Sequence, residues 1–131
     1  MSATQLRRCA APHCRGAADL RSRLCGACHD RLAEQLRELP ARYAALDHGR
    51  PPGTPLPPRA VEARSAIRGV LASWAYLVVN GRVVPRPVRS VAGMAEFLHQ
   101  HIDWLGAHPA VAEIAGEIAE LAARVPTELA A

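Results

Sequence analysis

The four cysteines of the chain lie in two closely spaced pairs near the N-terminus. Four residues separate Cys9 from Cys14 in CAAPHC, and two residues separate Cys25 from Cys28 in CGAC. Such short spacings allow two thiolates to bind one metal ion from a single turn of backbone, and two such turns complete a tetrahedral shell. The sequence therefore predicts a Zn²⁺ site with these four ligands: Cys9, Cys14, Cys25 and Cys28.

The same residues leave alternatives open. His13 or His29 lies beside a cysteine and would serve as a ligand in its place. A Cys-x-x-Cys pair is also a redox motif, but the strand pattern of a thioredoxin-like unit is missing around CGAC. Two disulfides need an oxidising compartment, and the N-terminus lacks the apolar segment of a secretory signal. Four thiolates leave no open coordination position, which predicts a structural metal.

The remaining sequence contains no pattern typical of an active site. We find no nucleophile paired with a base, no glycine-rich phosphate loop and no pair of catalytic carboxylates, so we expect neither catalysis nor a small-molecule substrate. Glu96 and His99 form half of a di-iron carboxylate–histidine motif, but the other half is missing. No run of 18 apolar residues is present, so we expect no membrane-spanning helix and a cytoplasmic location.

The positive charge is concentrated in the first half of the chain. All 16 basic residues are arginines and the net charge is +4. Residues 1–68 hold twelve arginines against six acids, and residues 69–131 hold four against six. This asymmetry predicts an anionic partner, such as the backbone of DNA or RNA, for five arginines that flank the cysteines: Arg7, Arg8, Arg15, Arg21 and Arg23. The alternative is that these arginines only keep the surface soluble.

The elements that must position these residues are predicted to be helices. A stripe of apolar residues at helical spacing runs through residues 25–46: Leu32, Leu36, Leu39, Tyr43 and Leu46. Residues 48–59, HGRPPGTPLPPR, hold five prolines and two glycines and are typical of an extended linker. Three further amphipathic helices are predicted over residues 60–80, 90–105 and 111–125, with Trp74 in their core.

The predicted fold is therefore mainly α. Residues 1–47 form a small zinc-binding knuckle or ribbon followed by a helix, residues 48–59 a linker, and residues 60–131 an antiparallel three-helix bundle. Asn80-Gly81 is expected to end the first helix of this bundle, and Ser90 to cap the second. The linker also leads us to expect that the two units fold independently.

Several segments together resemble a family of small proteins from actinobacteria and their phages. These are the C-x4-C pair, LCGACHDRL, SWAYLV and FLHQHIDWLGAHPAVAEIAGEI, so that the resemblance extends from Cys9 to about Arg124. Longer members of that family continue into a second segment rich in cysteine and histidine and a helix-turn-helix, which these 131 residues do not include. The resemblance implies a zinc-knuckle protein associated with DNA or with mobile elements.

Two functional hypotheses follow. The first is a zinc-stabilised, non-catalytic protein that binds nucleic acid or acts as a regulator, with the N-terminal arginines contacting phosphates. The second is a protein–protein adaptor in which the zinc knuckle and the bundle each offer a docking face and no nucleic acid is bound.

Overall fold

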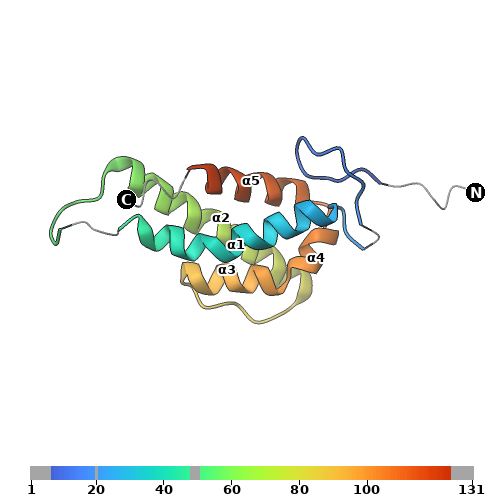
Figure 1. The fold of residues 1–131 in the computed structure, drawn as a ribbon. Coiled ribbons are helices and arrows are strands. Elements are labelled where there is room, and N and C mark those ends of the chain that lie inside the picture. The colour runs from blue at the N-terminus through green and yellow to red at the C-terminus, as the bar shows by residue number, and fades with distance from the viewer. Residues whose placement is uncertain (1–6, 20, 48–50, 125–131) are drawn as a thin grey trace, which may run out of the picture.

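The structure is a computed structural model, and it describes residues 7–19, 21–47 and 51–124. These residues form five helices: α1 (Gly26–Ala45), α2 (Pro58–Arg82), α3 (Val91–Gln100), α4 (Ile102–Ala107) and α5 (Val111–Arg124). Figure 1 shows an elongated bundle with the cysteine-containing segment at one end. This segment, residues 7–19 and 21–25, is called the knuckle below. The prediction of a mainly α fold with an N-terminal cysteine cluster is confirmed.

One hydrophobic core runs through the bundle and includes α1. The leucines of its predicted stripe, Leu32, Leu36 and Leu39, are fully buried, and α1 packs most extensively against α3. Leu24 of the knuckle is buried in the same core. The segments on the two sides of the linker therefore share a core, which argues against the independent folding expected from the proline-rich composition.

Helices α2 and α3 run in the same direction, which corrects the prediction of an antiparallel arrangement (Figure 1). Arg82, at the end of α2, lies with its Nη1 3.0 Å from Nδ1 of His101, directly after the end of α3. A parallel pair needs a connection that returns along the bundle. Residues 83–90 are non-helical, since Pro85 and Pro87 disfavour a helix. Eight extended residues span roughly 26 Å, more than the ~15 Å length of α3.

The N-terminal end of α2 lies earlier than predicted. The helix begins at Pro58, inside the segment that composition assigned to the linker. A proline at the first helical position needs no amide hydrogen bond and already has a helical φ, so this proline starts a helix instead of preventing one. The described part of the linker is therefore residues 51–57, and residues 48–50 lie outside the described ranges.

The C-terminal end of α2 lies later than the predicted stop at Asn80-Gly81. The helix continues to Arg82, and the left-handed residue that ends it is Val83, with a φ of 53°. Gly81 has a different role, because a Cβ there would lie 2.6 Å from Cη2 of Trp104. The glycine permits the close approach of an aromatic ring. None of the helices in the described ranges has the length and apolarity needed to cross a bilayer.

The single helix predicted over residues 90–105 is two helices. Oγ of Ser90 accepts a 2.9 Å hydrogen bond from the backbone N–H of Gly93, which confirms the predicted cap. The helix breaks at His101, where φ is −103° and ψ is 20°. The backbone N–H of His101 is shared between the carbonyl oxygens of Phe97 and Leu98, each at 3.2 Å, so the last turn of α3 is tightened.

Candidate metal centre and basic surface

The four predicted ligands converge in the structure. One Sγ atom from each of Cys9, Cys14, Cys25 and Cys28 lies within 4.8 Å of all the others, and those of Cys14 and Cys25 are 3.8 Å apart. In a tetrahedral site with metal–sulfur bonds of about 2.3 Å, neighbouring sulfurs lie about 3.8 Å apart. The cluster therefore has dimensions that fit a four-thiolate structural metal site.

The first cysteine pair is held by a short antiparallel turn. Arg8 and Ala17 form an isolated antiparallel bridge, and the backbone N–H of Cys9 donates a 2.8 Å hydrogen bond to the carbonyl oxygen of Gly16. Within this turn, between Cys9 and Gly16, His13 takes a left-handed conformation, with a φ of 64°. This turn brings the chain back across itself, so the two ends of the C-x4-C loop face the second pair.

Backbone N–H groups point at the sulfurs. The N–H of Cys25 donates to Sγ of Cys9 at 3.2 Å, and the N–H of Cys28 donates to Sγ of Cys25 at 3.4 Å. A third bond of 3.4 Å runs from the N–H of Gly16 to Sγ of Cys14. Donors aimed at sulfur favour the thiolate over the thiol, and the thiolate is the form that binds a metal.

The pKa values of the second pair move in opposite directions. The backbone N–H of Cys28, aided by its side chain, lowers the pKa of the Cys25 thiol to about 7. Burial, followed by the other three cysteines, raises the pKa of the Cys28 thiol to about 12. Cys25 therefore ionises readily by itself, whereas Cys28 needs a cation beside it. A bound metal ion would supply that positive charge.

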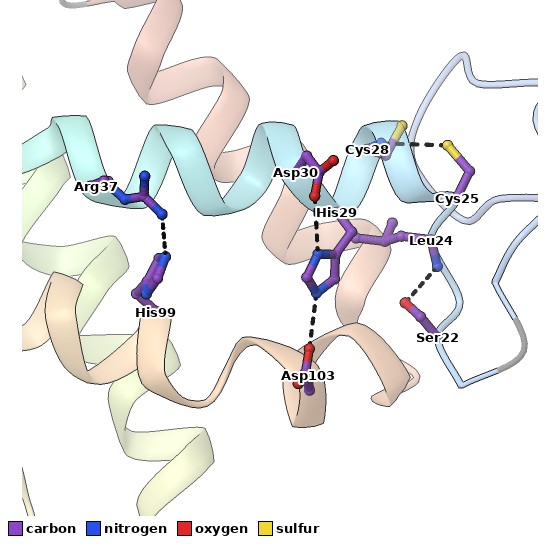
Figure 2. A network of polar contacts seen from close by, with 9 residues as sticks. All are labelled: Ser22, Leu24, Cys25, Cys28, His29, Asp30, Arg37, His99 and Asp103. Carbon is purple, nitrogen blue, oxygen red and sulfur yellow. Dashed lines mark hydrogen bonds and ion pairs between the residues drawn. The ribbon is translucent and has the colours of Figure 1, made fainter.

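The histidines considered as alternative ligands lie outside the cluster. The group that the described residues bring together consists of the four cysteines alone. His29 lies between two aspartates, with Nε2 3.2 Å from Asp103 and Nδ1 3.9 Å from Asp30 (Figure 2). His13 is exposed. The geometry thus favours four-cysteine ligation.

The knuckle is fastened to the bundle through α4, a contact that sequence reasoning missed. Oγ of Ser22 accepts from the backbone N–H of Leu24 at 3.0 Å and donates to the carbonyl oxygen of Gly106 at 3.2 Å. The backbone N–H of Arg23 donates to the same carbonyl at 2.8 Å. A Cβ at Gly106 would lie 2.8 Å from Oγ of Ser22, so the glycine permits this contact. No periodicity or motif marks either residue in the sequence.

Four of the five arginines proposed to contact phosphate are exposed: Arg7, Arg8, Arg15 and Arg21. The fifth differs. Arg23 is half-buried, and its Nε donates a 3.1 Å hydrogen bond to the carbonyl oxygen of Ala107. Its side chain therefore helps to hold the knuckle against α4, and its contact with phosphate stays a prediction.

A groove of about 980 Å³ lies between the knuckle, α1 and α5. Small residues of α5, Ala112, Ala115 and Gly116, are part of its lining. Arg15 and Arg31 line it from the knuckle and α1, and three glutamates line it from α5: Glu113, Glu117 and Glu120. The basic surface of the knuckle is thus bounded by acidic side chains on the side that faces α5.

The other residues singled out in the sequence have structural partners. Nη2 of Arg37 lies 3.3 Å from Nε2 of His99 (Figure 2), and Glu96 accepts a hydrogen bond from Gln100. Trp74 is buried, and its indole N–H donates to Oε1 of Glu117 at 3.3 Å.

Comparisons with known proteins identify no relative of this chain: no family model, no curated protein and no solved structure matches it.

Proposed function

We propose that this chain is a zinc-stabilised, non-catalytic protein that binds nucleic acid through the arginines of its knuckle. The observation that carries the proposal is the contrast between arginines with and without partners. In the helices, six of the eight arginines hydrogen-bond within the protein: Arg37, Arg42, Arg64, Arg68, Arg82 and Arg124. Four of the knuckle's five stay exposed, and no partner within the described residues holds them.

Zinc is the metal that suits this cluster best. Four thiolates in a closed tetrahedral shell are typical of structural zinc sites, and the compact spacing of the sulfurs fits its bond length. The knuckle has no strand pairing beyond one isolated bridge, so a metal would supply much of the energy that holds its shape. A fixed knuckle positions its arginines before any ligand arrives, which reduces the entropy lost on binding.

The proposed contacts are to phosphate and carry little sequence preference. The arginines lie on a turn and not on a helix that could enter the major groove, so we expect most of their contacts to be with phosphate. The glutamates of α5 beside Arg15 repel a polyanion, so we expect approach from the side of Arg7, Arg8 and Arg21. Binding of this kind is weak, on the order of micromolar at physiological salt, and falls steeply as salt is added.

The test is fluorescence anisotropy with a random DNA duplex and a random RNA strand, titrated across salt. We expect Arg7→Ala/Arg8→Ala/Arg21→Ala to weaken binding at least tenfold on every sequence and to flatten the salt dependence. The matched control, Arg59→Ala/Arg86→Ala/Arg89→Ala, removes the same charge from exposed arginines that lie outside the knuckle and that have no partner among the residues the structure describes. Its binding should change far less. Absence of binding by the zinc-loaded wild type at low salt, or equal losses in the two variants, would refute the proposal.

A second candidate function is the protein–protein adaptor, and the groove between the knuckle, α1 and α5 is the observation that favours it. Its small residues would admit a peptide backbone, and its two walls carry opposite charges. An adaptor would retain its partner in high salt and show no affinity for duplex DNA or RNA. The resemblance to actinobacterial and phage zinc-knuckle proteins supports the nucleic-acid hypothesis, which therefore stands first.

A further inference from the structure

The outward face of α2 carries no charge from Gly69 to Asn80, roughly three turns of helix. We use this name for its exposed residues Gly69, Ala72, Ser73, Tyr76 and Asn80, and the exposed Arg68 lies at its N-terminal edge. The opposite side of the helix is buried in the core, and every residue between Arg68 and Arg82 is uncharged. The outward face of a surface helix normally carries charged and polar residues, so a run of this length without charge is unusual there.

This face carries a projection and a matching hole. The side chain of Tyr76 is 66% exposed, an unusual state for an aromatic residue in the middle of a helix. Gly69 lies two turns earlier on the same face, and a Cβ added there would meet no atom within 4 Å. The open space above the glycine therefore serves no contact within this chain, in contrast to Gly81, where Trp104 fills it.

We propose that this face binds a second copy of the chain, with the two α2 helices packed antiparallel around a two-fold axis between Ala72 and Ser73. In this register Tyr76 of each copy lies over Gly69 of the other, so the projection and the hole fill each other twice. A two-fold interface requires such self-complementarity, because the same patch is used by both copies. The small residues at the axis allow the helices to approach to about 8–10 Å.

The charges at the ends of the face agree with this arrangement. The same two-fold axis places Glu62 of one copy opposite Val83 of the other, next to Arg82. Glu62 and Arg82 are both exposed, and an acid meets a base at each end of the interface. Val83, which is 89% exposed, adds apolar surface at the same place. The uncharged centre lets two identical surfaces meet without like-charge repulsion.

The proposed dimer goes beyond the proposed nucleic-acid function and is compatible with it. The knuckle lies near the C-terminal end of α2 (Figure 1), so an antiparallel pair places the two knuckles at opposite ends with their arginines free. An interface of one helix from each copy falls at the small end of the range for specific complexes, so we expect a weak dimer.

Sedimentation equilibrium of the zinc-loaded full chain, at concentrations up to about 500 µM, tests the proposal. The apparent mass of the wild type should rise with concentration from the 14.0 kDa of one chain towards twice that value. Gly69→Leu should raise the dissociation constant at least tenfold because leucine fills the space that Tyr76 needs. Leucine has a higher helix propensity than glycine, so a loss of dimer would not reflect a weaker helix.

The choice of leucine makes the two outcomes opposite. If the face associated only through nonspecific hydrophobic contact, a larger apolar residue would strengthen association. That result would overturn the proposed register, in which Tyr76 lies over Gly69. Ala44→Leu, an exposed position on α1, is the matched control and should dimerise like the wild type. A wild type that keeps the monomer mass at the highest concentration, or equal behaviour of Gly69→Leu and Ala44→Leu, would also overturn the proposal.

Discussion

Arg23 of the knuckle donates its backbone N–H to the carbonyl oxygen of Gly106 in α4 at 2.8 Å. The hydrogen bond joins the segment between the two cysteine pairs to a helix from the last third of the chain. Together with buried Leu24, it makes the shape of the knuckle and the packing of α4 depend on each other. The structural effect of a metal at the cysteines is therefore expected to reach well beyond the residues that bind it.

Loss of the metal should destabilise the whole chain. We expect one zinc per chain. We expect Cys28→Ser or a chelator to lower the midpoint of thermal unfolding, measured by the signal of the two tryptophans, which lie in α2 and α4. The reason is that α1 starts at the second cysteine pair and shares its core with α3. Elemental analysis and near-ultraviolet circular dichroism are the measurements.

The control for the metal site is His13→Asn, which keeps a residue that tolerates the positive φ of this position. It should retain zinc and the wild-type midpoint. Loss of zinc in this variant would show that His13 is a ligand, and an unchanged tryptophan signal in Cys28→Ser would show that the bundle folds independently, as the linker suggested.

The two exposed glycines of α2 should respond oppositely to alanine. In Gly81→Ala the new Cβ would meet Trp104 at 2.6 Å, so we expect a loss of about 1–3 kcal/mol despite the better helix propensity of alanine. In Gly69→Ala nothing lies in the way, and we expect a gain of about 0.5–1 kcal/mol. Urea denaturation at low protein concentration measures both, and a gain in Gly81→Ala would contradict the contact.

Trp74→Ala should lower the free energy of unfolding by about 3–5 kcal/mol, because it removes a large buried side chain from the interface of α2 with its neighbours. Tyr76→Ala, an exposed aromatic on the same helix, is the matched control and should cost less than about 1 kcal/mol in the monomer. Equal losses in the two variants, measured by urea denaturation, would show that burial is not what makes Trp74 important.

Stability should fall in mild acid through His101. Burial, followed by the positive charge of Arg82, lowers the pKa of His101 below its ordinary value. In the unfolded chain this pKa is about 6.5, so the unfolded state binds the proton first as the pH falls. The contribution of neutral His101 to the free energy of unfolding is thus complete above pH ~6.5, and it is lost as the pH drops towards the pKa of His101 in the folded protein.

The measurement is urea denaturation at pH 7.5 and pH 5.5. The wild type should lose more stability between the two conditions than His101→Gln, which keeps an acceptor for Arg82 but does not titrate. An equal loss in both proteins would assign the acid sensitivity to other groups.

Sequence patterns within a single segment correctly predicted the local structure of that segment. The spacing of Leu32, Leu36 and Leu39 indicated the helix and its buried side, Ser90 indicated a cap, and the spacing of the cysteines indicated their convergence. In each case the interaction joins residues that are close in sequence, or the residue type itself limits the chemistry. Local propensity and ligand spacing are then sufficient.

Contacts between distant segments left no such signal. Gly81 was predicted to end the helix because glycine favours a left-handed conformation. In the structure the glycine is needed because the ring of Trp104 packs against it. Ser22 and Gly106 meet only because α4 packs against the knuckle, and the hydrogen bond from Arg23 to Ala107 depends on the same packing. The direction of α3 relative to α2 depended on where an extended segment ends, which the apolar spacing of a helix does not encode.

The return of residues 83–90 along the bundle has a consequence for how the chain folds. The most extensive interface joins α1 to α3, and the contact between Arg37 and His99 spans 62 positions of sequence. High contact order slows folding because long loops must close before native contacts form. During synthesis the apolar side of α1 leaves the ribosome long before α3 exists to cover it. We expect this helix to need the cysteine cluster, a transient partner or a chaperone until the last third of the chain arrives.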